Sequence, residues 1–447
     1  MATFVDLRRM LNNDQRLTSV FLTFSSRLQS EDFRRAVKTN TVVEELVISA
    51  DESFFQECPE DGIQDILEGL GRLPRLRKVS INSYPNCPGI VSMKAINAMV
   101  SGAKQLECLI IADLQVTGSP QDFADFAEHV QGMFFLGSFA FVECKILLED
   151  NSGGTSSSSS SPVPQSMIRK NRPLSSQDDE ESPSPLLLDP LLFSLSMLPS
   201  LQVVSIQPKQ QGSLGSLSVS AATALCLSAS IKMLKLRNMD LTPAHAASMA
   251  FMLQNNQTLR TLELGCLQGG AMDAATASSL GGMIQRNQAL HSLELAIETM
   301  LSDTAAEILA KALRHNRRLR SFALTARTPK TIGRVSTKAR KSMLQMLQYN
   351  YTLEKFFLFR KYPLSREFKL YSKLNQLGRG QLLTNQQNTN STEAWIQSLA
   401  NVKDDLNSIF YFVSCNPTLC MSSTELSTKR KTSQSEEEER PSKKQRV

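Results

Sequence analysis

The sequence predicts an α/β solenoid: a horseshoe of strand–helix units with a parallel sheet on its inner side and helices outside. The first observation is a short frame that recurs along the chain: Asn, two residues, Leu, two residues, Leu, one residue, Leu, as in residues 256–264. The second is the regular distance between copies, and the third is the helical spacing of apolar residues in the intervals. Because so short a unit cannot bury its own apolar face, the units must stack.

The frame occurs eleven times, with Val, Ile or Phe replacing Leu in some copies. Its first apolar residue stands at positions 17, 43, 76, 106, 136, 201, 231, 259, 290, 319 and 353. The steps run from 26 to 34 residues, except for one of 65 residues from Leu136 to Leu201. Since side chains alternate along a strand, Leu262 and Leu264 should point into the core and the residue between them should face the concave surface.

The intervals between copies are typical of helices. Residues 243–256 follow Thr242, a good N-cap residue, and carry small and apolar residues on one face. Residues 273–287 and 303–316 begin with Asp273 and Asp303, and carboxylates suit a helix N-terminus. Each unit is therefore expected to be a strand, a turn and a helix.

On these residues the chain resembles the leucine-rich repeat proteins of the ribonuclease-inhibitor type, whose units are about 28 residues long. The resemblance covers about residues 12–360 apart from one interruption, and it implies a leucine-rich repeat horseshoe. The family usually places Asn or Cys three residues after the third leucine, where the side chain bonds the turn backbone. Of the copies compared at this slot, only the one with Cys144 conforms, so we expect the turns to be held in another way.

Composition divides the chain further. Residues 149–186 are rich in Ser and Pro and have too few apolar residues to offset the entropy of ordering, which predicts a disordered insertion. This insertion is either tolerated at a turn or is a docking loop phosphorylated at its Ser-Pro pairs. The expected organisation is N-terminal repeats at 1–148, the insertion at 149–186, C-terminal repeats at 187–365, a helical C-terminal cap at 366–421 and a disordered tail at 422–447.

The cap is expected to cover the exposed edge of the last repeat. Asn390 with Glu393 three residues later forms a capping-box pattern, and apolar residues from Trp395 to Phe410 keep near-helical spacing. The block also resembles the tail that follows such repeats in uncharacterised proteins of unicellular algae. The shared motifs are L-N-x-x-G-R at residues 374–379 and N-P-x-L-C at residues 416–420. This resemblance implies no chemistry.

The tail has two basic clusters around an acidic spacer, and it resembles the bipartite import signals read by an importin-α-like carrier. The basic residues are Lys429, Arg430, Lys431, Lys443, Lys444 and Arg446. The resemblance implies a protein that is nuclear or shuttles between nucleus and cytoplasm; a merely solubilising tail is the alternative. Ser433 and Ser435 precede the glutamates 436–439, which suits an acidophilic kinase, and phosphate there would add negative charge beside the signal.

Sequence motifs typical of catalytic sites or metal sites are missing from the sequence. Eight cysteines lie singly, four histidines have no metal-ligand spacing, and no G-x-S-x-G sequence precedes a helix. No apolar run approaches the ~18 residues that a membrane span needs, and residues 1–16 lack the apolar core of a secretory signal. We therefore expect no enzyme activity, no metal, no cofactor and no membrane partner.

The function predicted from the repeats is a non-catalytic scaffold that binds a protein partner on its concave surface. Affinity is expected to centre on aromatic anchors such as Phe357 and Phe359. The full set of expected contact residues is Met233, Lys235, Arg237, Thr261, Glu263, Ser292, Glu294, Lys355, Phe357 and Phe359.

Two alternatives stay open. Some proteins of this repeat type activate small GTPases, so the chain is alternatively a GTPase-activating repeat protein. Residues 308–353 contain eleven Lys and Arg and no carboxylate, so association with nucleic acid through these basic repeats is the other alternative. The sequence does not name the partner.

Overall fold

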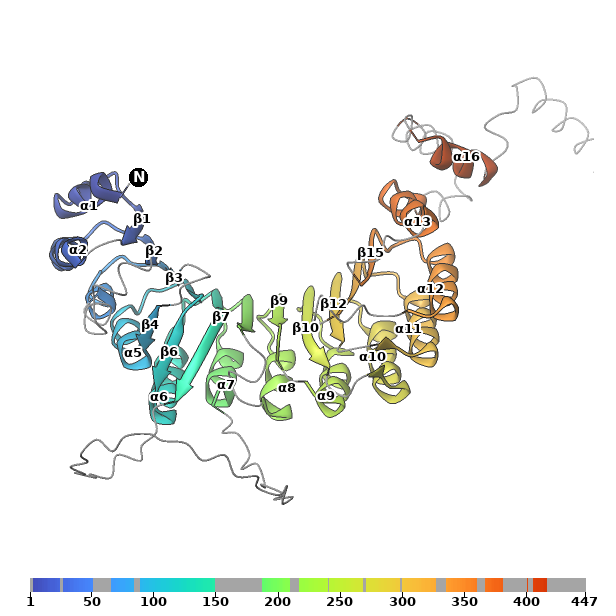
Figure 1. The fold of residues 1–447 in the computed structure, drawn as a ribbon, viewed down its shortest axis with the longest axis horizontal. Helices are drawn as coiled ribbons and strands as arrows, with labels where there is room; N and C mark the ends of the chain where they lie inside the picture. Colours follow the sequence, from blue (N-terminus) through green and yellow to red (C-terminus); the bar gives the residue numbers. More distant parts are fainter. Residues whose placement is uncertain are drawn as a thin grey trace, which may run out of the picture.

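A curved parallel sheet lines the inner side of the molecule and helices cover its outer side, as a computed structural model shows (Figure 1). The strands follow one another in the sheet in chain order. The structure describes residues 3–24, 27–50, 66–83, 89–148, 187–209, 217–239, 241–267, 271–297, 300–326, 335–359, 366–380, 400 and 405–415.

The strands of the inner sheet confirm the repeating frame. Each begins two residues after the first apolar residue of its copy, and each pairs in parallel with the next. The predicted α/β fold is therefore correct. These strands are β1 (Ser19–Phe24), β2 (Glu45–Ala50), β3 (Lys78–Ser83), β5 (Cys108–Ala112), β7 (Ser138–Leu148), β8 (Val203–Pro208), β9 (Met233–Leu236), β10 (Thr261–Leu267), β12 (Ser292–Ile297), β14 (Ser321–Ala326) and β15 (Lys355–Leu358).

Short strands lie beside the turns that follow the inner strands; β4 and β6 join the main sheet, whereas β11 and β13 form a separate two-stranded sheet. β4 pairs with β6, β6 pairs with the second half of β7, and β11 pairs with β13. These short strands are β4 (Ile90–Ser92), β6 (Gln115–Gly118), β11 (Ala271–Met272) and β13 (Met300–Leu301).

Seven of the outer helices that the structure describes begin at a Ser, Thr or Asp N-cap, whereas the helix at Asp189–Met197 has Leu188 there and no side-chain cap. Thr242 and Asp273 cap their helices as predicted, by accepting hydrogen bonds from the backbone of His245 and Thr276. Asp303 also lies at the start of its helix, as predicted: it is the first helical residue, and the preceding Ser302 is the N-cap. The outer helices are α1 (Thr3–Leu11), α2 (Arg27–Thr39), α5 (Met93–Gly102), α6 (Pro120–Gln131), α7 (Asp189–Met197), α8 (Val219–Leu227), α9 (Pro243–Leu253), α10 (Ala274–Arg286), α11 (Asp303–His315) and α12 (Thr337–Tyr349).

One apolar core runs between the sheet and the helices from unit to unit. Leu259, Leu262 and Leu264 are all buried, as the alternation along the strand predicts. Cys144, which occupies the family's turn position, is fully buried with its thiol against the carbonyl oxygens of Ile111 and Val142.

The turns from helix to strand are held by the asparagine that opens the repeating frame. Its side-chain Oδ1 accepts hydrogen bonds from the backbone N–H groups two and three residues later, and its Nδ2 donates to a carbonyl of the preceding unit. For Asn350, Nδ2 lies 2.6 Å from the oxygen of Leu313 and 3.0 Å from that of Asn316. We call this set the asparagine ladder: Asn40, Asn256, Asn287, Asn316 and Asn350.

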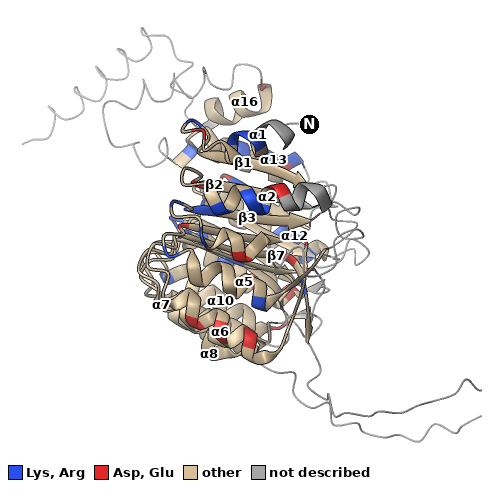
Figure 2. Ribbon diagram, turned by 90° about the vertical axis from the view of Figure 1, so that its left-hand side faces the viewer, with Lys and Arg blue, Asp and Glu red and all other residues tan. Residues whose placement is uncertain are grey.

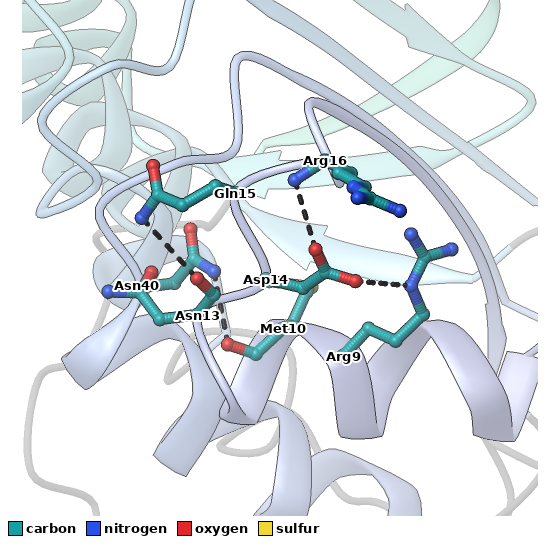
Figure 3. A network of polar contacts seen from close by, with 7 residues as sticks. All are labelled: Arg9, Met10, Asn13, Asp14, Gln15, Arg16 and Asn40. Carbon is teal, nitrogen blue, oxygen red and sulfur yellow. Dashed lines mark hydrogen bonds and ion pairs between the residues drawn. The ribbon is translucent and has the colours of Figure 1, made fainter.

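In the first unit an aspartate, Asp14, stands where later units have the ladder asparagine (Figure 3). Asp14 accepts a hydrogen bond from the backbone N–H of Arg16 at 3.0 Å and pairs with Arg9 at 2.9 Å. These two hydrogen bonds, that of Arg16 above all, hold the pKa of Asp14 below its usual value. Asn40 of the next unit donates to the oxygen of Met10 at 3.1 Å.

In the middle of the solenoid, serine side chains make the hydrogen bonds that connect a turn to the turn of the preceding unit. Ser200 donates to the carbonyl oxygens of Phe134 and Leu136 at 2.6 and 2.9 Å, and Ser230 donates to that of Leu198 at 2.8 Å. Each of these turns is thus bonded to the turn before it, as the ladder turns are.

The C-terminal cap continues the ladder. It contains α13 (Arg366–Gln376) and α16 (Leu406–Cys415), which pack through the buried Leu374 and Phe412. Asn375 donates to the oxygens of Asn350 and Leu353, and Arg379, 1% exposed, donates to those of Leu347 and Asn350. The L-N-x-x-G-R motif therefore satisfies the carbonyls that the last repeat would otherwise leave open.

Several predicted segments lie outside the described residues. They are the whole insertion 149–186, the tail 422–447 and the residues from Asn390 that predict a capping box. The disorder expected of the insertion and tail, and the domain boundaries, stay predictions. Among the described helices, none is long and apolar enough to cross a membrane.

The asparagine ladder predicts where the fold is most sensitive to a small change. Replacing Asn350 by Ala should lower the free energy of unfolding by roughly 2–4 kcal/mol, because buried backbone groups lose their partners. Urea denaturation followed by circular dichroism measures this. Asn255→Ala, at an exposed position beside the ladder residue Asn256, is the control and should change stability by under about 0.5 kcal/mol. Equal losses in the two variants would contradict the assigned role.

Candidate interaction surface on the concave face

Alternate residues of the inner strands face away from the helices and form the concave surface. Strand register places these residues in rows across the sheet. The central row passes from Ser205 through Lys235, Glu263, Glu294 and Ala323 to Phe357.

Four charged side chains form a cluster in the C-terminal half of this surface. Glu263 lies between two cations, with its Oε1 3.1 Å from Nζ of Lys235 and its Oε2 2.7 Å from Nε of Arg237. Arg237 also reaches Glu294, at 3.3 Å between Nη2 and Oε2. The carboxylates are more enclosed, at 12% and 22% exposed, than the cations at 30% and 36%. The neighbouring strands therefore hold these charges in one fixed pattern, which we call the concave charge cluster.

The adjacent row is small and mostly uncharged. It carries Met233, Thr261, Ser292 and Ser321, all half-buried, and ends at the exposed Lys355. Nine of the ten residues that were expected to contact a partner therefore lie on the concave surface. Their binding to a partner stays a prediction.

Phe359 is the exception, and the expectation that it lines the concave surface is wrong. Its side chain is 2% exposed and belongs to the apolar core. β15 ends at Leu358, and Phe359 adopts a left-handed backbone conformation with φ of 49°. Its N–H donates to the oxygen of Leu324 at 2.7 Å. This change of backbone direction breaks the alternation on which the expectation rested.

Exposed aromatic rings stand at both ends of the central row. Phe357 is 47% exposed on β15, and Phe21 is 58% exposed on β1. The row between Phe21 and Ser205 is Val47, Ser80, Ile110 and Ala140, all half-buried and uncharged. Sequence reasoning missed Phe21, although it occupies the same place in the first copy of the frame as Glu263 in a later copy.

The described thiols differ in their access to solvent. Cys108 is half-buried on the concave surface, and burial raises its pKa. Cys144 and Cys226 are in the core, where burial raises the pKa of each to about 12. No group of His, Cys, Asp or Glu within the described residues has an arrangement that could hold a metal ion.

The cations of the basic repeats that the structure describes lie on the helices and turns, away from the concave surface. Arg314 stacks over the ring of Tyr349 at 3.8 Å, and Arg317 over that of Tyr351 at 4.2 Å. Lys338 pairs with Glu307 at 2.9 Å, a hydrogen bond that raises the pKa of the lysine. One face of each of these two tyrosine rings is thus covered by an arginine of the same chain.

The thiols give a test of the concave surface in solution. At about pH 8, iodoacetamide should modify Cys108 slowly and leave Cys144 and Cys226 intact until the chain unfolds, because only the thiolate reacts. The rate at Cys108 should rise with pH, since its pKa lies above the usual value. Mass spectrometry of tryptic peptides measures each site. Modification of Cys144 as fast as that of Cys108 in the folded protein would contradict the described core.

Comparison with models of known protein families gives no match, and comparison with curated proteins gives none either. Solved structures do match. The chain is similar to actin-binding site 2 of leiomodin-1, with 16% identity and a TM-score of 0.30, over 38% of this chain and 93% of that one. It is similar to the tropomodulin C-terminal domain of Caenorhabditis elegans (14%, 0.29, over 37% and 98%) and to the leucine-rich repeat-containing protein LegL7 of Legionella pneumophila (12%, 0.33, over 76% and 94%). These likenesses concern the fold, and the finer resemblances to the ribonuclease-inhibitor type and to algal proteins stay predictions.

Proposed function

We propose that this protein is a non-catalytic scaffold that binds a protein partner on its concave surface. The observation that carries the proposal is the concave charge cluster, where Glu263 is fixed between Lys235 and Arg237. Ion pairs this exposed contribute little to stability. A rigid charge pattern does favour specific recognition, because like charges on a wrong partner are costly there.

The aromatic ring of Phe357 supports the same proposal. It lies two strands from Glu294 in the central row, and such rings often supply most of the energy of an interface. The proposed contact thus combines a polar centre with an apolar anchor on one rigid sheet. Function in this fold depends on such surface residues and not on the leucines.

Co-purification from nuclear extract tests the proposal. The wild-type chain, treated with nuclease and washed at moderate salt, should retain a discrete protein partner detected by mass spectrometry. The double variant Arg237→Ser/Phe357→Ser should lose at least about tenfold of that partner, because it removes a charge and the anchor. Tyr349→Ser removes an equally exposed ring from the helical side and is the control. Equal recovery with the concave variant and wild type would refute the proposal.

The alternatives have distinct outcomes in the same experiment. Recovery that collapses with nuclease would favour nucleic acid bound by the basic repeats, whose complexes also weaken steeply as salt rises. Recovery of a small GTPase whose GTP hydrolysis the chain accelerates would favour the GTPase-activating alternative. We favour the scaffold because, in the described repeats, the cations at 308–353 lie off the concave surface and partly against their own aromatic rings.

We also propose that the tail directs the protein to the nucleus through an importin-α-like carrier. The support is the spacing of the two basic clusters in the sequence, in which each Lys and Arg can reach a separate acidic site on the carrier.

The import proposal predicts the effect of two substitutions. Lys443→Ala/Lys444→Ala in a fluorescently tagged protein should reduce the nuclear-to-cytoplasmic ratio severalfold, since the second cluster loses two of its three cations. Lys311→Ala/Lys341→Ala removes the same charge from exposed helical positions and should leave the ratio unchanged. Microscopy measures both, and an unchanged ratio in the tail variant would sink the import proposal.

A further inference from the structure

A patch of exposed apolar side chains lies where the outer helices end in the middle of the solenoid. Phe134 and Phe135 follow α6 and are 66% and 62% exposed. Met197, the last residue of α7, is 73% exposed, and Leu227, the last of α8, is 62% exposed. Phe193, one turn before Met197, is 42% exposed. We call these five residues the edge patch. Apolar side chains gathered on neighbouring units, unlike single ones, mark interaction sites.

The edge patch contains a cavity, and a hydrogen bond connects the turn after α7 to the turn that carries Phe134 and Phe135. A cavity of about 730 Å³ opens between the ends of α7 and α8, lined by Phe193, Met197, Pro199 and Leu227 among others. Ser200 bonds the carbonyl of Phe134, so the turn after α7 is fixed against the turn that carries the two phenylalanines. None of the residues lining the cavity is charged. The hollow suits an apolar side chain presented by a partner.

Cations flank the edge patch on both sides along the same edge of the solenoid. Figure 2 shows Lys and Arg in the loops at this edge, on the left of the view, where the helices end. Residues 132–138, 197–203 and 227–231 carry no charge. On the N-terminal side stand Arg72, Arg75, Arg77, Lys78 and Lys104; on the C-terminal side stand Lys232, Arg260, Arg286, Arg317, Arg318 and Arg320.

Most of these cations can still form ion pairs with carboxylates of a partner protein. Arg77 pairs with Glu107 and Arg320 with Glu354, so two of them are compensated within the chain. Lys232 donates to an amide oxygen, that of Gln202 at 3.1 Å, which does not neutralise its charge. Cations near helix C-termini are favourable for the helix dipole in any protein. The helix dipole does not explain why cations are missing from residues 132–138, 197–203 and 227–231, where the edge patch lies.

We propose that the edge patch binds an apolar segment of a partner protein that is flanked by acidic residues on both sides. Charge complementarity selects this occupant: the apolar centre fits the hollow, and carboxylates on either side meet the flanking cations. A second copy of this chain fits poorly, since its own basic flanks would face the same basic flanks. Three helix spacings of roughly 8–10 Å separate Lys104 from Lys232. An extended apolar block of about eight residues spans that distance.

The inference does not depend on the concave surface, and its test separates the two. The probes are two phage-displayed peptide libraries of random apolar blocks of about eight residues, one flanked by glutamates and one by lysines. The wild-type full-length chain should enrich the glutamate-flanked library at least about tenfold over the lysine-flanked one. Met197→Glu/Leu227→Glu should abolish the enrichment, and both positions are exposed enough to accept Glu without unfolding.

Two further variants and one further measurement complete the test. Lys232→Glu/Arg260→Glu should bring the two libraries to similar enrichment, because it reverses one flank. Phe357→Ser on the concave surface should leave the enrichment unchanged. Equal enrichment of both libraries by wild type, or no enrichment of either, would overturn the inference. So would a dimer in analytical ultracentrifugation that Met197→Glu abolishes, since the occupant would then be a second copy.

Discussion

The hydrogen bonding of buried turns is the constraint on which the rest of this structure depends. Every unit returns from helix to strand through a tight turn whose backbone groups are enclosed by neighbouring units, and such groups must find partners. An asparagine amide supplies a donor and an acceptor at once. In the turn of Asn350 it satisfies its own backbone and a carbonyl of the unit before, so each unit depends on its predecessor. The two ends of the ladder differ accordingly: Asp14 begins it as an acceptor, and Arg379 ends it as a donor.

The ladder also determines which surface residues become neighbours. Bonding each turn to the previous one keeps the strands in register, and this register brings Lys235, Glu263 and Glu294 side by side although about 30 residues separate each from the next. The same turns all lie at one edge of the solenoid, where the helices end. Residues in or beside these turns, such as Phe134 and Leu227, are therefore gathered into one patch although they lie in different units.

The sequence was sufficient for the fold because the information is local and repeated. The spacing of leucines placed every inner strand, and Thr242 and Asp273 identified helix starts from residue type alone. The role of the asparagines could not be predicted from the sequence, because the carbonyl groups that they bond lie in another unit, about 30 residues away. Phe359 was expected on the concave surface because side chains alternate along a strand. The left-handed backbone at this residue interrupts the alternation, and the sequence does not reveal that interruption. The ion pairs of the concave charge cluster could not be predicted from the sequence, because they depend on the register of three neighbouring strands.

The repeating frame separates the demands of folding from those of binding. Apolar positions and the asparagine are committed to the core and the ladder, whereas the residues between them face either the concave surface or the edge. The chain fills these free positions unevenly: charges gather around Glu263, and uncharged apolar residues gather around Met197. Neither pattern is part of the apolar core that runs between the sheet and the helices. The two surfaces lie on adjoining units but look in different directions, so a partner held by the sheet leaves the edge accessible. The two proposed contacts would therefore not compete for the same surface.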